Sequence, residues 1–260
     1  MNAGLSTGLR HLPAVGLEEL NTAAALQTRV DRKYVIPVLR AKQLLASLDA
    51  GVRVLEMDGL RTFEYDSVYF DTPQLDSYLL AARGRRRRYK VRTRTYVDSA
   101  ASFLEVKTEG GRETTVKERI PYGLEDRSRI TAEGLAYVND TLAAAVGAVP
   151  AGPLGPVLET RYRRTTLFLP ASGSRATLDE AVTWRRPGQQ PWLLDGSMVL
   201  ETKSGSTAGP LDRHLWANGI RPCRISKFAT GMAALCPQLP ANRWHSTLGR
   251  SLPLTPVPPA

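Results

Sequence analysis

The stretch RYKVRTRTY, residues 88–96, decides the fold because basic residues alternate in it with apolar or hydroxyl-bearing ones. Successive side chains of a β-strand point to opposite sides, so a period of two places all the cations on one face. Like charges on one face repel one another, and this face must therefore meet solvent or a polyanion. The stretch predicts a β-strand with a basic face, and the remaining question is what that face binds.

The same pattern returns elsewhere in the chain. The triplet Glu-x-Lys follows an apolar residue at 105–107 and again at 201–203, and the segments 116–120 and 159–165 also carry paired cations at a spacing of two. Solvation would explain one such face, but repetition over several strands favours a shared cavity. Burying cations without partners is costly, so the faces must be wet or filled by anions. A barrel with this interior would be a polyanion tunnel, where sparse carboxylates could hold a divalent metal.

The composition is that of a globular chain with an anionic partner. The chain has 260 residues, 42% of them hydrophobic, and a net charge of +10, which favours nucleic acid, a phosphorylated small molecule or an acidic membrane surface. Two cysteines and three histidines do not supply a convincing zinc site, and reduced thiols are typical of the cytoplasm. We find no signal peptide, membrane span, phosphate-binding glycine loop or Ser/His/Asp set.

Three parts are expected along the chain: a loosely ordered leader at 1–27, one domain at 28–236, and a Pro-rich irregular tail at 237–260. Hairpin-linked strands with few crossover helices predict an α+β fold with an antiparallel sheet or barrel. The predicted strands span 29–36, 61–70, 86–97, 102–109, 114–120, 157–169, 175–185 and 197–204. The predicted helices span 17–26, 37–51, 73–83, 132–146, 211–218 and 226–235.

These motifs resemble the VTC domain, the polyphosphate polymerase domain of the vacuolar transporter chaperone complex and its bacterial relatives. That family belongs to the triphosphate tunnel metalloenzymes of the CYTH-like superfamily. The resemblance implies a closed antiparallel β-barrel, the triphosphate tunnel fold, with peripheral helices and a C-terminal plug helix. The matching segments, in chain order, are DRKY 31–34, SVYFDTP 67–73, KVRTRTY 90–96, FLEVK 103–107, VKER 116–119, YRR 162–164, RATLD 175–179, VLETK 199–203 and RISKF 224–228.

The resemblance also implies roles for individual residues. Glu201 would be the chief ligand of Mn²⁺ or Mg²⁺, with Glu105 and Asp179 as helpers. Arg163 competes with Arg164 for one role, because a slip of one residue exchanges the two faces of a strand. The expected catalytic cations are Lys33, Arg92, Arg94, Lys107, Lys117, Arg164, Arg175, Lys203 and Lys227. The expected substrate-binding cations are Arg88, Lys90, Arg119, Arg163 and Arg224.

One departure from the superfamily bears on the reaction. Hydrolytic members carry Glu-x-Glu-x-Lys in the first strand, whereas this chain has Arg29, Asp31 and Lys33 at those positions. Loss of the first carboxylate suits a polymerase, in which the end of a phosphate chain is the acceptor. We therefore expect a metal-dependent phosphotransferase that moves the γ-phosphoryl group of ATP to polyphosphate.

Two alternatives stay open. One is a tunnel triphosphatase that hydrolyses inorganic or nucleoside triphosphate, and the other is a non-catalytic module that binds polyphosphate or inositol phosphates. Duplex nucleic acid cannot reach cations that face inward, so it is not an expected partner. Association with a membrane protein is compatible with a chain that has no span of its own.

Overall fold

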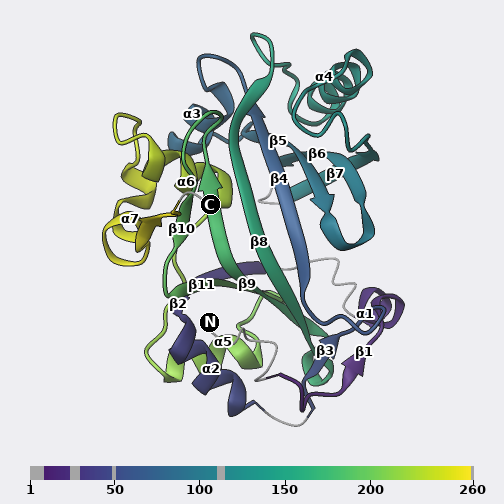
Figure 1. The fold of residues 1–260 in the computed structure, drawn as a ribbon, viewed down its shortest axis with the longest axis vertical. Coiled ribbons are helices and arrows are strands. Elements are labelled where there is room, and N and C mark those ends of the chain that lie inside the picture. Colours follow the sequence, from purple (N-terminus) through teal and green to yellow (C-terminus); the bar gives the residue numbers. More distant parts are fainter. Residues whose placement is uncertain (1–8, 24–29, 49–50, 110–114, 259–260) are drawn as a thin grey trace.

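The computed structural model describes residues 9–23, 30–48, 51–109 and 115–258, and its long strands form one antiparallel sheet. Figure 1 shows β4, β8 and β9 side by side in the middle of the molecule, with β5, β6 and β7 to one side. Along the sheet, the strands are β2 (Val30–Pro37), β11 (Ser197–Ser204), β9 (Ser174–Arg185), β8 (Gly155–Leu169), β4 (Phe63–Asp71), β5 (Tyr89–Tyr96), β6 (Ala101–Glu109) and β7 (Thr115–Pro121).

The two ends of this row of strands are β2 and β7. Within the described ranges no ladder of hydrogen bonds joins them, so the closed barrel expected from the sequence is not confirmed. The sheet nevertheless curves round on itself. Residues 223–226 join β2 to β5: Cys223 N donates to the carbonyl of Lys33 at 2.8 Å, and Nζ of Lys90 donates to the Ser226 hydroxyl at 3.1 Å. Strands β2 and β5, which are far apart in the row, therefore face a common interior.

Helices cover the outer side of the sheet in two places. Helix α4 (Ala132–Val146) packs Val138 and Leu142 against Val91 and Leu104, which belong to β5 and β6. Helices α2 (Val38–Ala46) and α5 (Pro210–Ala217) cover β2, β11 and β9 in the same way. Since the apolar side of β5 faces α4, the basic side of this strand faces the interior.

The interior itself receives helix α6 (Lys227–Leu235). Its Phe228 stacks on Tyr69 of β4 with ring centroids 5.2 Å apart, and the indole nitrogen of Trp184 donates to the carbonyl of Lys227 at 2.7 Å. Helix α3 (Asp76–Ala82) packs on the other side of α6, where Tyr78 meets Phe228 edge to face. The helix predicted at 226–235 therefore exists and packs against the inner face of the sheet, whereas its role as a plug stays a prediction.

The C-terminal segment is ordered rather than irregular. It forms helix α7 (His245–Arg250) and strand β12 (Leu254–Pro256), which pairs with β10 (Trp192–Leu194). Trp244 is 6% exposed and packs on Tyr78 with ring centroids 5.9 Å apart. Burial of apolar residues that lie between the prolines therefore stabilises the structure of this segment.

The N-terminal segment also carries regular structure. In residues 9–23, strand β1 (Ala14–Val15) pairs in parallel with β3 (Arg53–Leu55), and helix α1 (Leu17–Ala23) follows. Short 3₁₀ helices lie at Val97–Ser99, Pro170–Ser172 and Asn242–Trp244. Parts of the expected elements, at 1–8, 24–29, 49–50 and 114, lie outside the described residues.

Candidate functional site

The register of the sheet aligns cations across neighbouring strands on the inner face. Lys90 of β5 lies opposite Lys107 of β6, which in turn lies opposite Lys117 of β7. One step along, Arg92 lies opposite Glu105. Opposed residues of antiparallel strands have neighbouring side chains, so this row concentrates positive charge around one carboxylate.

The other half of the sheet continues the basic face. Glu201 of β11 lies opposite Lys33 of β2, and Lys203 lies between Asp31 of β2 and Arg175 of β9. The shared interior therefore contains cations from strands at both ends of the sheet.

Glu105 is the counterion of one pair of cations. The carboxylate is 2% exposed, and its Oε2 accepts from Nε and Nη2 of Arg92 at 2.8 and 2.6 Å. Its Oε1 accepts from Nζ of Lys117 at 3.1 Å. Burial would raise the pKa of Glu105, but Arg92, Arg94 and Lys117 outweigh it and hold the pKa far below the usual range. Both oxygens are thus already bound by cations.

Asp179 holds a second pair of cations, from β8 and α6. It is 1% exposed and forms a bidentate pair with Arg164, with distances of 2.6 Å from Nε to Oδ1 and 2.8 Å from Nη2 to Oδ2. Lys227, the first residue of α6, also donates to Oδ2. The helix begins there because Ser226 caps it, its hydroxyl accepting from Ala229 N at 3.3 Å. Arg164 and Lys227 overcome burial and lower the pKa of Asp179.

Glu201 belongs to a third cluster. The ammonium of Lys203 contacts Glu201 and lies 3.0 Å from Oδ2 of Asp31, while Nζ of Lys33 is 4.0 Å from the second oxygen of Glu201. Burial of Glu201 would raise its pKa, but the charges of Lys33 and Lys203 outweigh this effect and hold the pKa well below the usual range. A lysine ammonium therefore lies between the two carboxylates of this cluster.

The three carboxylates expected to bind metal do not form one metal centre. Glu105, Asp179 and Glu201 lie in separate clusters, and each is paired with cations. Among the described residues, no group of three or more Asp, Glu, His or Cys side chains could hold an ion. Mg²⁺ is usually held by one or two carboxylates together with waters and substrate phosphates, so the described carboxylates offer no preformed all-protein site for Mn²⁺ or Mg²⁺, and Glu201 would hold such an ion only together with the phosphates of the substrate.

Two lysines of the inner face have pKa values near neutrality. Burial, followed by the charges of Lys107 and Lys33, lowers the pKa of Lys90 to about 7. Burial and the charge of Lys33 lower the pKa of Lys107 to about 8. The amine of Lys90 also donates to the Ser226 hydroxyl at 3.1 Å, next to the start of α6. An anion in this interior would restore the charged form of both lysines.

Tyrosines line the same face, and the sequence analysis assigned them no role. Tyr65 and Tyr162 stack with centroids 5.2 Å apart, and the Arg164 guanidinium carbon lies 5.2 Å from each ring centre. The hydroxyl of Tyr69 accepts from Nη1 of Arg92 at 3.0 Å. Although burial opposes it, Arg92 and Arg94 lower the pKa of Tyr69. The alternation of Tyr65 and Tyr69 along β4 is the signal that could have placed them beside the cations.

Of four further predicted residues, Arg163 and Arg224 lie away from this interior, whereas Arg88 and Arg119 lie at the edge of the inner face. Arg163 is exposed and lies opposite Glu180, on the other face from Arg164, because neighbouring residues of a strand point to opposite sides. Arg224 is exposed, whereas Arg88 pairs with Glu109 at the start of β5. Arg119 is exposed and lies 4.5 Å from the ring centre of Phe103.

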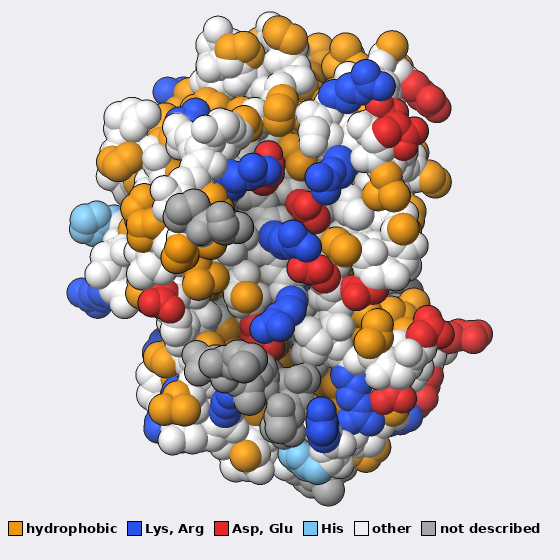
Figure 2. Space-filling view, in the orientation of Figure 1, with side chains coloured by type: hydrophobic (Ala, Val, Ile, Leu, Met, Phe, Trp, Pro, Cys, Tyr) orange, Lys and Arg blue, Asp and Glu red, His pale blue; other side chains and the backbone are white. Residues whose placement is uncertain are grey.

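Arg163 belongs to an outer surface of mixed charge. Figure 2 shows basic and acidic side chains alternating down the middle of the molecule, over β4 and β8. The ion pairs of these strands include Arg161–Glu64 at 2.8 Å and Arg127–Asp66 at 3.1 Å. The outer face therefore neutralises its charges in exposed ion pairs, whereas the ion pairs of the inner face are built on the buried carboxylates of Glu105 and Asp179.

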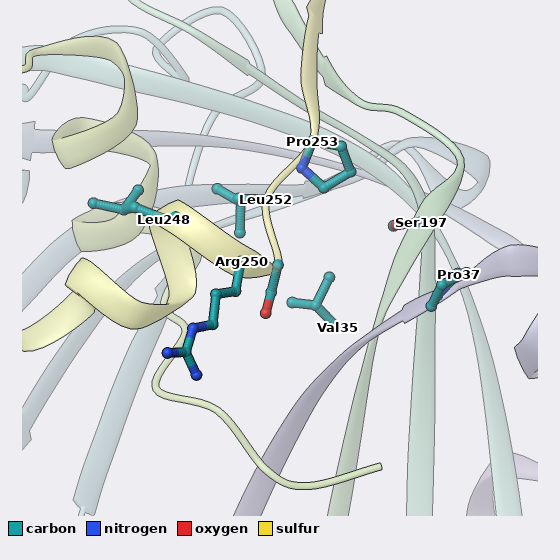
Figure 3. A pocket seen from close by; sticks show the side chains of 9 residues that line it. Val35, Pro37, Ser197, Leu248, Arg250, Leu252 and Pro253 are labelled. Carbon is teal, nitrogen blue, oxygen red and sulfur yellow. The ribbon is translucent and has the colours of Figure 1, made fainter. Parts of the chain in front are cut away.

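A cavity of about 400 Å³ lies apart from these clusters (Figure 3). Val35, Pro37 and Ser197 line it on one side, and residues 248–253 line it on the other. None of its lining residues is among the predicted site residues, so the cavity is not the candidate site.

Within the described ranges, no helix is both long enough and apolar enough to cross a bilayer.

Solved structures share the fold at low sequence identity. A proposed adenylyl cyclase from Hippeastrum, HpAC1, described as having a dominant triphosphatase activity, matches with a TM-score of 0.50 and 19% identity, over 79% of this chain and 96% of its own. A proposed adenylate cyclase from Bacillus halodurans matches with a TM-score of 0.51 and 12% identity, over 76% of this chain and 94% of its own. No curated protein matches the chain.

The VTC domain family matches residues 28–236, most of the chain and the same range that the sequence motifs indicated. The chain therefore belongs to the VTC domain family.

Proposed function

We propose that this protein is a polyphosphate polymerase that transfers the γ-phosphoryl group of ATP to a growing phosphate chain. The observation that carries the proposal is the convergence of cations from β2, β5, β6, β8, β11 and α6 on one interior face. Such a face matches a linear polyanion, which carries negative charge along its whole length. Membership of the VTC family agrees with it.

The residues of the interior would act by binding and orientation. Phosphoryl transfer needs the donor and acceptor oxygens in line and needs stabilisation of charge on the transferring group. Arg92 and Arg164 are each held in place by a buried carboxylate, so their guanidinium groups are oriented before the ligand arrives. Lys33, Lys107 and Lys203 would bind neighbouring phosphates as point charges.

The cofactor is part of the proposal. Family members use Mn²⁺ or Mg²⁺, which supplies charge neutralisation on the phosphates when bound. The described carboxylates do not make a preformed site for such an ion, and the steps above rely on the chain's own cations alone. Cytoplasmic location and inositol phosphate binding stay predictions from the sequence.

Hydrolysis is the second candidate. The HpAC1 structure is described as having a dominant triphosphatase activity, and its fold is similar to that of this chain. A triphosphatase would use the same cations to bind inorganic or nucleoside triphosphate, but would pass the phosphoryl group to water. The two reactions therefore differ in the acceptor.

The reaction product separates the candidates. The purified chain is incubated with ATP, with and without Mn²⁺ or Mg²⁺, and the products are resolved on a polyacrylamide gel stained for polyphosphate. We expect a ladder of long chains that the variant Arg164→Ala does not make. Orthophosphate without chains would support the triphosphatase instead, and tight binding of polyphosphate without turnover would support a binding module.

A further inference from the structure

Three polar atoms without partners lie together on the inner face. They are Ser67 Oγ of β4, Thr160 Oγ1 of β8 and Nε of Arg94 of β5, all buried and without a hydrogen bond. Ser67 lies opposite Arg94 on one side and opposite Thr160 on the other, so the three side chains are neighbours across adjacent strands. Ser67 and Thr160 are each 1% exposed. Buried donors are normally paired, and a cluster of unpaired ones needs an explanation.

Arg94 is less fully compensated than the other arginines of the inner face, although Glu105 lies near enough for the charge of Arg94 to lower its pKa. Arg92 and Arg164 each have a buried carboxylate partner, but within the described part of the chain no ion pair forms at Arg94. Among the described residues, its guanidinium forms one hydrogen bond, a 3.2 Å contact from Nη2 to the hydroxyl of Tyr162. A half-buried guanidinium that forms no direct ion pair gains more from an added anion than one that already holds a carboxylate.

The surroundings enclose this cluster between two pairs of rings. Tyr65 stacks on Tyr162 one step along the strands, and Tyr69 stacks on Phe228 of α6 one step in the other direction. Arg94 reaches from β5 across β4 to Tyr162 of β8, and its guanidinium carbon is 5.7 Å from the ring centre of Tyr65. The side chain of Arg94 therefore passes over the strand that carries Ser67.

The chemistry of the cluster selects the ligand. Two hydroxyl groups and an Nε–H can all donate, and together they suit oxygen atoms that only accept. A water molecule would satisfy the hydroxyls but would bring no negative charge to Arg94, which forms no direct ion pair with a described carboxylate. A phosphoryl group satisfies both requirements, because its oxygens are acceptors and carry negative charge.

We propose that Ser67, Thr160 and Arg94 form a subsite that binds one phosphoryl group of the polyanion. The identity of the ligand rests on the proposed function, whereas the subsite itself rests on the unpaired atoms. Arg94 leaves Tyr162 when the ligand binds, which opens the two hydroxyls to a phosphoryl oxygen. Ser67 and Thr160 then act as binding residues in addition to the cations.

The variants Ser67→Ala and Thr160→Val test this, because each removes one hydroxyl with little change in shape. Calorimetric titration with inorganic tripolyphosphate should show roughly a tenfold or greater loss of affinity for each, the effect of losing a hydrogen bond to a charged group. In ligand-free protein the same variants should keep or raise the midpoint of thermal unfolding, since an unsatisfied buried hydroxyl is removed.

The control is Tyr89→Phe, which removes another buried hydroxyl without a partner, on the outer side of β5 against α4. It should leave the affinity unchanged. Unchanged affinity in the Ser67 and Thr160 variants would overturn the subsite, and a lowered unfolding midpoint with that result would show that the hydroxyls bind a structural water.

The binding assay is independent of turnover. If the wild-type protein binds tripolyphosphate but makes no chains, the polymerase proposal fails and the subsite is still measured by the variants. If the wild-type protein binds no tripolyphosphate, both proposals fail.

Discussion

Glu105 shows how one buried carboxylate organises two cations. Since removing it leaves Arg92 and Lys117 without their counterion, Glu105→Gln should lower the free energy of unfolding by about 3–5 kcal/mol. The folded pKa of Glu105 lies below its ordinary value of 4.5, so its stabilisation is present above that pH and is lost as the pH falls further. Urea unfolding at neutral pH and at acid pH measures this.

The difference between wild type and Glu105→Gln should therefore shrink below about pH 4. The matched control is Glu64→Gln, which breaks an exposed pair with Arg161 and should cost less than about 1 kcal/mol. A difference at Glu105 as small as that at Glu64 would show that the buried cluster does not hold the strands together.

Lys90 makes anion binding sensitive to pH near neutrality. Its pKa is lowered to about 7, chiefly by burial, and a polyanion stabilises the protonated amine. Binding of tripolyphosphate above this pH should take up a proton, and affinity should fall as the pH rises above about 7. Titration calorimetry in buffers of different ionisation enthalpy measures the uptake. Equal uptake by wild type and Lys90→Gln would contradict the assignment.

At the scale of elements, the position of α6 depends on the absence of a side chain at Gly231. A Cβ there would overlap the ring of Trp184, which is fully buried and hydrogen-bonded to the start of the helix. Gly231→Ala should destabilise the protein by about 1–3 kcal/mol and weaken tripolyphosphate binding, because Lys227 moves with the helix. Gly249→Ala, where a Cβ meets nothing within 4 Å, is the control. For both variants, urea unfolding measures the stability and calorimetric titration measures the affinity for tripolyphosphate.

The long elements were predictable because their periodicity is strong. The predicted strand 102–109 corresponds to β6 at Ala101–Glu109, and the predicted helix 132–146 to α4 with the same ends. The pairings of β12 with β10 and of β1 with β3 were not predictable, since short strands join segments far apart in sequence and carry no periodicity. Alternation along β8 places Arg163 and Arg164 on opposite faces, but which of these faces lies inside depends on the pairing of Arg164 with Asp179 of β9.

At the scale of the whole molecule, charge pattern predicted that cations from many strands share one face, but not how they are compensated. The pairing of Arg164 with Asp179, and of Arg92 with Glu105, depends on registers that no single strand reveals. From the sequence, these carboxylates were expected to bind a metal, whereas in the fold they hold arginines and lysines.

Anion binding to the inner face should weaken with added salt, as titration with tripolyphosphate at two ionic strengths would show.

The central claim is that the inner face passes a phosphoryl group to a phosphate chain. The most direct measurement follows ADP and orthophosphate together while the protein consumes ATP in the presence of Mn²⁺. Transfer to a chain predicts that ADP accumulates without an equal amount of orthophosphate, and that the missing phosphate is recovered as polymer. Equal amounts of ADP and orthophosphate throughout the reaction would contradict the account and identify a hydrolase.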